Sequence, residues 1–93
     1  MANTSNTAIL RERIYNFILR TGNAGVTDEE IALAFDLPGD VERPRRNELV
    51  KNNLVANSGI RRMTTSGRTA TVWKSTRVLN KITKTATKVA RKA

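Results

Sequence analysis

Three arginines stand close together in the segment "DVERPRRNELVKNNLV". Guanidinium groups bind phosphates and carboxylates through paired, charge-assisted hydrogen bonds, so such a cluster suits an anionic partner. The segment otherwise has the pattern of an amphipathic helix, and the cluster falls in its expected first turn. That turn is the positive end of a helix, where carboxylates are favoured and cations are not. Helix stability alone therefore does not explain Arg43, Arg45 and Arg46.

An intrahelical ion pair would offset part of the electrostatic cost of these arginines but would not explain why they are present. We expect Arg45 or Arg46 to pair with Glu42 or Glu48, which stabilises a helix by about 0.2–0.5 kcal/mol. A misplaced cation costs about 0.3–1 kcal/mol. Since three arginines are present, ligand binding explains them better than pairing does.

A second basic group surrounds a glycine-containing turn in "GIRRMTTSGRTATVWK". Arg61 and Arg62 precede the turn, Arg68 lies at it, and Ser66 and Gly67 are expected to expose backbone N–H groups. The alternative is an ordinary turn with solubilising charges. Two further cations, Lys74 and Arg77, continue this basic surface towards the C-terminus.

The net charge of +9 is unevenly distributed over the 93 residues. Residues 1–48 carry six basic and eight acidic side chains, whereas residues 49–93 carry eleven basic and no acidic ones. This asymmetry predicts a polyanionic partner contacted mostly by the second half. A cationic surface that serves only solubility is the alternative.

The composition excludes several classes of protein. The chain has no cysteine and no histidine, so disulfides, zinc sites and histidine-based catalysis are ruled out. The carboxylates occupy cap and turn positions, and no glycine loop suits a phosphate, so we expect neither an enzyme nor a bound cofactor or metal. No apolar run approaches the roughly 20 residues of a membrane span. We therefore expect a cytoplasmic protein.

Local signals predict three helices in the first half. Apolar residues at helical spacing predict a helix over 7–21, after a flexible segment 1–6. Thr27 and Glu30 form a capping box that begins a short helix ending near Asp36. The third helix begins between Asp40 and Pro44, with Pro44 suited to the first helical position, and continues to about residue 53.

The period then changes to that of a β-hairpin. Residues 60–64 and 69–74 are rich in Thr, Val, Ile and Trp, and "TSGR" lies between them. A lone hairpin is marginally stable in water, so it must pack on the helices. Trp73, with Val72 or Ala70, is the expected anchor.

This order of elements resembles a winged helix-turn-helix, as found in small stand-alone DNA-binding proteins of bacteria and phages. "TDEEIALAFDL" looks like the first half of a helix-turn-helix, "RPRRNELVKNNLV" like a recognition helix, and "SGIRRMTTSGRTATVW" like a wing. The resemblance covers residues 7–76. It implies a mainly α fold with a β-hairpin (α+β), in which three helices and a two-stranded wing precede a C-terminal helical extension, 77–93.

The resemblance also implies roles for the basic residues. The N-terminal part of a recognition helix enters the major groove, so residues 43–51 would contact duplex DNA, with the 60–74 hairpin on the flanking backbone or minor groove. Relative to core-facing Leu49, we expect Arg43, Asn47 and Lys51 on the opposite face. Arg45 and Arg46 are expected nearer the core edge, within reach of flanking phosphates.

The extension 77–93 carries two stripes at helical spacing. The apolar stripe consists of Leu79, Ile82, Ala86 and Val89, and the basic stripe of Lys81, Lys84, Lys88 and Arg91. Three arrangements stay open: packing on the first helix, a homodimer seam, or phosphate binding along DNA.

Three functions follow in order of preference. The first is a small transcriptional regulator that binds preferred DNA sites and associates with the nucleoid. The second is an architectural, nucleoid-type protein that coats DNA with little sequence preference. The third is a phage-like adaptor that binds a host protein through Val55, Ile60 and Met63.

Overall fold

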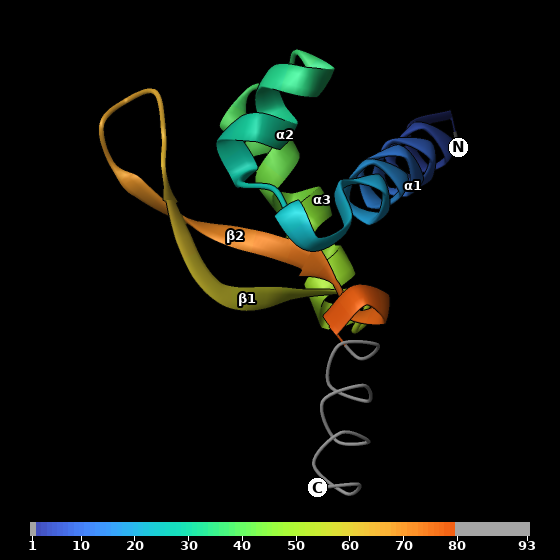
Figure 1. The fold of residues 1–93 in the computed structure, drawn as a ribbon. Coiled ribbons are helices and arrows are strands. Elements are labelled where there is room, and N and C mark those ends of the chain that lie inside the picture. The colour runs from blue at the N-terminus through green and yellow to red at the C-terminus, as the bar shows by residue number, and fades with distance from the viewer. Residues whose placement is uncertain (1, 80–93) are drawn as a thin grey trace, which may run out of the picture.

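The protein has an α+β fold in which helices precede a two-stranded antiparallel hairpin (Figure 1). The computed structural model describes residues 2–79, with side chains from residue 6 onward. The elements are α1 (Ala2–Thr21), the 3-10 turn η1 (Gly22–Ala24), α2 (Asp28–Phe35), α3 (Gly39–Lys51), β1 (Val55–Met63) and β2 (Thr69–Ser75). A helical turn over 76–79 ends the described part, so the stripes predicted beyond Leu79 lie outside it.

Helix α1 begins earlier than predicted. Its apolar stripe buries Ile14 and Ile18 completely, as helical spacing requires. The helix starts at Ala2 rather than Thr7, so residues 2–6, predicted as flexible, are helical. The apolar period begins only after these polar residues, and a polar turn leaves no periodic signal in the sequence.

The predicted capping box at the start of α2 is confirmed. The Glu30 amide donates to Thr27 Oγ1 at 3.2 Å, and the Thr27 amide donates to Glu30 Oε1 at 3.0 Å. These bonds satisfy backbone donors that a helix start leaves unpaired. The helix ends at Asp36, whose left-handed backbone (φ 55°) turns the chain towards α3.

Helix α3 begins before Pro44, so the prediction that this proline occupies the first helical position is wrong. The cap is Pro38, and its carbonyl accepts from the Glu42 amide at 3.1 Å. Pro44 lies inside the helix, where its ring removes one backbone hydrogen bond. Asp40 and Glu42 consequently occupy the first turn and suit the helix dipole, while the arginines begin in the second turn.

The hairpin is longer than predicted. Strand β1 begins at Val55 rather than residue 60 and passes through an irregularity between Asn57 and Arg61. Thr64 and Arg68 close the turn, since the Thr64 amide donates to the Arg68 carbonyl at 2.7 Å. Gly67 adopts a positive φ of 83° there, which disfavours any side chain.

The core lies where the three helices and the hairpin meet. Its fully or almost fully buried apolar residues are Ile14, Ile18, Val26, Ile31, Leu49, Val55 and Val72. Trp73 packs against this core as predicted, and its backbone pairs with Val26 through bonds of 2.7 and 2.9 Å. A side chain at Gly25 would collide with Val72, so the chain entering α2 lies directly on β2.

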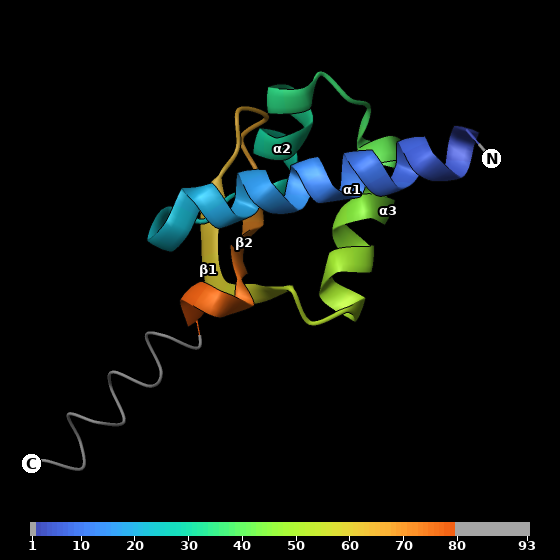
Figure 2. The ribbon, with the colours of Figure 1, turned by 90° about the vertical axis from the view of Figure 1, so that its right-hand side faces the viewer.

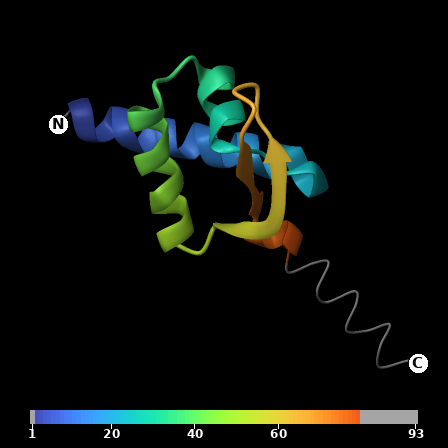
Figure 3. The same cartoon turned by 90° about the vertical axis from the view of Figure 1, so that its left-hand side faces the viewer.

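The elements form two layers. Helix α1 crosses one side of the molecule (Figure 2), while α3 and the hairpin lie side by side on the opposite side (Figure 3). No helix within residues 2–79 has the length and hydrophobicity needed to cross a bilayer.

Candidate nucleic-acid interface

The outer face of α3 carries three exposed polar residues at four-residue spacing. Arg43, Asn47 and Lys51 are all exposed, whereas Leu49 is buried, so the predicted division of this helix is confirmed. The Arg43 guanidinium lies back over Gly39, where a Cβ atom would be 2.9 Å from its Nη2. This position brings its charge to the N-terminal turn of α3.

Arg46 is not at the surface, which corrects its predicted place among the phosphate contacts. It is 8% exposed, and its guanidinium donates to both carboxylate oxygens of Asp28 at 2.8 and 2.7 Å. The same group lies 4.0 Å from the centroid of the Trp73 ring and donates to Asn47 Oδ1. Arg46 therefore joins α3 to α2 and β2.

Arg45 is also engaged within the fold. It pairs with Glu48 at 3.0 Å, as predicted for one of these arginines, and the same carboxylate accepts from Arg11 at 3.0 Å. Glu48 thus ties α3 to α1. The Arg45 side chain is half-buried, and its Nε is buried with no hydrogen-bond partner within the described chain.

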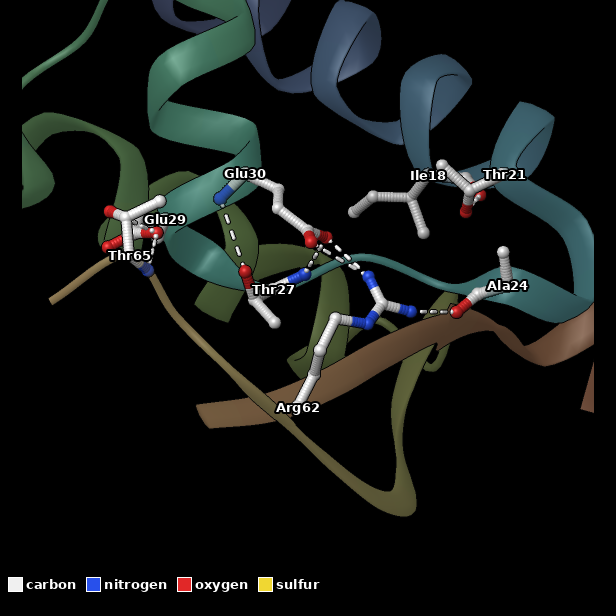
Figure 4. A network of polar contacts seen from close by, with 8 residues as sticks. All are labelled: Ile18, Thr21, Ala24, Thr27, Glu29, Glu30, Arg62 and Thr65. Carbon is white, nitrogen blue, oxygen red and sulfur yellow. Dashed lines mark hydrogen bonds and ion pairs between the residues drawn. The ribbon is translucent and has the colours of Figure 1, made fainter. Parts of the chain in front are cut away.

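Arg62 holds the hairpin against the start of α2. It donates to both carboxylate oxygens of Glu30 at 2.7 and 2.8 Å and to the Ala24 carbonyl at 2.5 Å (Figure 4). A few residues along, the Thr65 amide and hydroxyl both donate to Glu29 Oε1 at 3.0 Å. Arg62 was predicted to contact DNA, but in the free protein its charge is paired with Glu30 in a partly exposed ion pair.

The cations are exposed on the face of β1 opposite to Arg62 and in the turn. Arg61 lies across the hairpin and donates to the Thr69 carbonyl at 2.9 Å and to Thr69 Oγ1 at 3.1 Å. Arg68 and Ser66 are exposed at the turn. The predicted free amide of Gly67 is not available, because it donates to the Thr64 carbonyl at 3.1 Å.

The two cations expected to extend this surface have different environments. Lys74 is only 7% exposed, because it shares a strand face with buried Val72, and strand side chains alternate between faces. Its predicted exposure is therefore wrong. Arg77 is exposed, as predicted.

Glu42 is the main feature that the sequence interpretation missed. It is 1% exposed, and neither carboxylate oxygen has a hydrogen-bond donor within residues 2–79. Burial raises its pKa to about 8, and so does the Asp28 carboxylate, which accepts a hydrogen bond from Glu42 only when Glu42 is protonated and repels the ionised form. Glu42, Arg46 and Leu49 follow the spacing of one helix face, and this spacing is the signal that places both charged residues inward.

Comparison with known proteins finds no matching protein-family model and no similar curated protein.

Proposed function

We propose that this chain is a winged helix-turn-helix protein that binds duplex DNA, acting as a small transcriptional regulator. Helix α3 enters the major groove, and the hairpin contacts the flanking backbone or the minor groove. The order of three helices followed by an antiparallel hairpin is compatible with that fold.

One observation carries the proposal. Arg11, Arg45, Arg46 and Arg62 are paired with carboxylates, while Arg43 and Lys51 of α3 and Arg61 and Arg68 of the hairpin are exposed and have no ion pair within residues 2–79. The other exposed cations without an ion pair in this range are Arg13 and Arg20 of α1 and Arg77. Helix α3 and the hairpin are neighbours on the side away from α1 (Figure 3). No acidic residue follows Glu48 in the chain, so the hairpin has no carboxylate of its own to offset its positive potential.

The exposed residues of α3 suit different contacts. Arg43 carries a fork of donors that matches O6 and N7 of guanine, and Asn47 has the amide that matches adenine. Arg46 holds the Asn47 oxygen, so this side chain is oriented before DNA arrives. Lys51, one turn further along, is a point charge suited to phosphate.

The hairpin is oriented in advance in the same way. Because Arg62 and Thr65 bind the first turn of α2, the turn bearing Arg68 has a fixed position relative to the helices. A positioned arginine suits phosphate or a narrow minor groove. Preorganisation reduces the ordering cost of binding.

The salt dependence of binding tests this function. If six to ten phosphates are neutralised, affinity for duplex DNA falls about 10³–10⁵-fold between about 50 and 200 mM salt. Fluorescence anisotropy of a labelled duplex measures this over a salt series. Absence of binding at low salt, or an affinity that does not change with salt, contradicts the proposal.

An architectural DNA-coating role is the second candidate. The eleven basic and no acidic residues after position 48 favour it, since such a segment binds phosphates without reading bases. Selection from a random duplex pool separates the two roles. A defined motif supports the regulator, and an unselective pool supports the coating protein.

A protein-binding adaptor has narrower support. Ile60 and Met63 are 51% and 63% exposed on β1, whereas Val55, the third residue of the predicted contact, is buried. Capture of one defined protein that survives nuclease and high salt, and is lost in Met63→Asp, supports this role.

A further inference from the structure

A carboxyl group is buried in the first turn of α3 without a donor to satisfy it. Glu42 is 1% exposed, and neither of its oxygens has a hydrogen-bond donor within the described residues. A buried ionised carboxylate without partners is strongly unfavourable, so the uncharged form is favoured at such a site.

The groups around Glu42 strengthen this preference. Asp28 of α2 faces it, but Asp28 is itself an acceptor whose two oxygens are occupied by Arg46. The Arg46 guanidinium therefore binds Asp28 and donates no hydrogen bond to Glu42 among the described contacts. Arg46 and Arg43, on the same helix as Glu42, favour the ionised form, but burial and Asp28 outweigh them.

We propose that Glu42 holds its proton at neutral pH, and that loss of this proton weakens the packing of α3 on α2 and β2. The proton completes a cluster in which Glu42 faces Asp28, Asp28 binds Arg46, and Arg46 stacks on Trp73. Ionisation of Glu42 places a second negative charge beside Asp28 in this buried site. This proposal concerns the free protein and does not depend on DNA binding.

The direction in which folding shifts the pKa of Glu42 determines how stability changes with pH. The pKa of Glu42 is raised from 4.5 to about 8 on folding, so the folded state holds the proton more tightly than the unfolded state. The resulting stabilisation is fully present below 4.5, the pKa in the unfolded state. It declines as pH rises and is lost above about 8, the pKa in the folded state.

Few other groups in the chain ordinarily titrate near neutral pH. The chain has no histidine and no cysteine, the side chains that ordinarily titrate near neutrality. The α-amino group titrates near pH 8, but it is identical in all the variants below.

Trp73 provides the readout, since it is the only tryptophan and lies against Arg46. We expect its fluorescence to show a one-proton transition centred near the pKa of Glu42, about 8, and the melting temperature to fall as pH rises from about 4.5 to about 8. In Glu42→Gln, an uncharged isostere, both changes should disappear. In Asp40→Asn, which removes an exposed carboxylate from the same turn, both should persist.

A measurement on the unsubstituted chain keeps the test independent of how Glu42→Gln folds. Carbon-13 NMR of the glutamate carboxyl groups should show one resonance that titrates near pH 8. The proposal is overturned if no glutamate resonance titrates near this pH. It is also overturned if Glu42→Gln retains the fluorescence transition of the wild type.

Discussion

Arg43 and Arg46 lie three positions apart on α3 and have opposite environments. Arg46 is enclosed by Asp28 and Trp73, whereas Arg43 is exposed and makes no ion pair with the described part of the chain. Two neighbouring residues of one type therefore serve different purposes, one within the fold and one at its surface.

Arg46→Met should destabilise the protein. The substitution leaves the Asp28 carboxylate beside Glu42 without its counter-charge, and removing one partner of a buried pair costs on the order of 3 kcal/mol. Urea denaturation followed by circular dichroism measures the loss. The control Arg43→Met should change the free energy of unfolding by no more than about 0.5 kcal/mol. Equal effects of the two substitutions would show that the Arg46 cluster has no special role in stability.

Arg43 and Arg68 should differ in what they contribute to DNA binding. Arg43→Ala removes a candidate base contact, so it should reduce affinity for the preferred site by about 1–3 kcal/mol and relax sequence preference. Arg68→Ala should weaken all sequences alike, because phosphate contacts carry no sequence information. Competition between preferred and scrambled duplexes measures both. If both variants weaken every duplex equally, α3 does not read bases.

At the scale of elements, the start of α2 is also the anchor of the hairpin. The Glu30 carboxylate closes the capping box with Thr27 and binds Arg62, which is 32 residues away (Figure 4). Glu29 binds Thr65 near the turn. The position of the hairpin is thus set by residues that also begin a helix.

Arg62→Ala should release the hairpin turn. The ion pair is partly exposed, so its loss costs about 0.2–1 kcal/mol, and amide exchange at Thr65 should accelerate by up to about fivefold. Hydrogen exchange followed by NMR measures this. Arg68→Ala, at an exposed turn position, is the control and should leave the Thr65 rate unchanged. Unaltered exchange in Arg62→Ala would mean that Glu29 alone holds the turn.

Predictability from the sequence depended on how local each interaction is. The capping box of Thr27 and Glu30 was predictable because its partners are three residues apart. The start of α3 was not, because Pro38 and Pro44 both suit a helix start and only the folded chain selects Pro38.

In the candidate site, too, local features were predictable from the sequence and long-range contacts were not. The outward direction of Arg43, Asn47 and Lys51 followed from helical spacing. The spacing of Arg46 and Leu49 on one helix face was a local signal that Arg46 faces inward. The carboxylates that bind Arg46 and Arg62 lie 18 and 32 residues away, so no local pattern identified these partners.

At the scale of the whole molecule, the acidic side chains of the helices neutralise inward-facing arginines. Asp28, Glu30 and Glu48 each bind at least one arginine. The exposed cations of α3 and the hairpin remain without an ion pair among the described residues, and these two elements lie side by side (Figure 3). Their position, rather than the net charge of +9, is the central claim of the proposed function.

Two double variants of equal net charge test this claim most directly. Arg43→Gln/Arg68→Gln removes two exposed charges from α3 and the hairpin turn, and Arg13→Gln/Arg20→Gln removes two exposed charges from α1. Affinity for a duplex should fall at least about tenfold in the first variant, with a salt dependence reduced by up to about two phosphate contacts. The second should stay within about twofold of the wild type. Equal losses in the two variants would mean that only net charge matters and that α3 and the hairpin are not the DNA-binding surface.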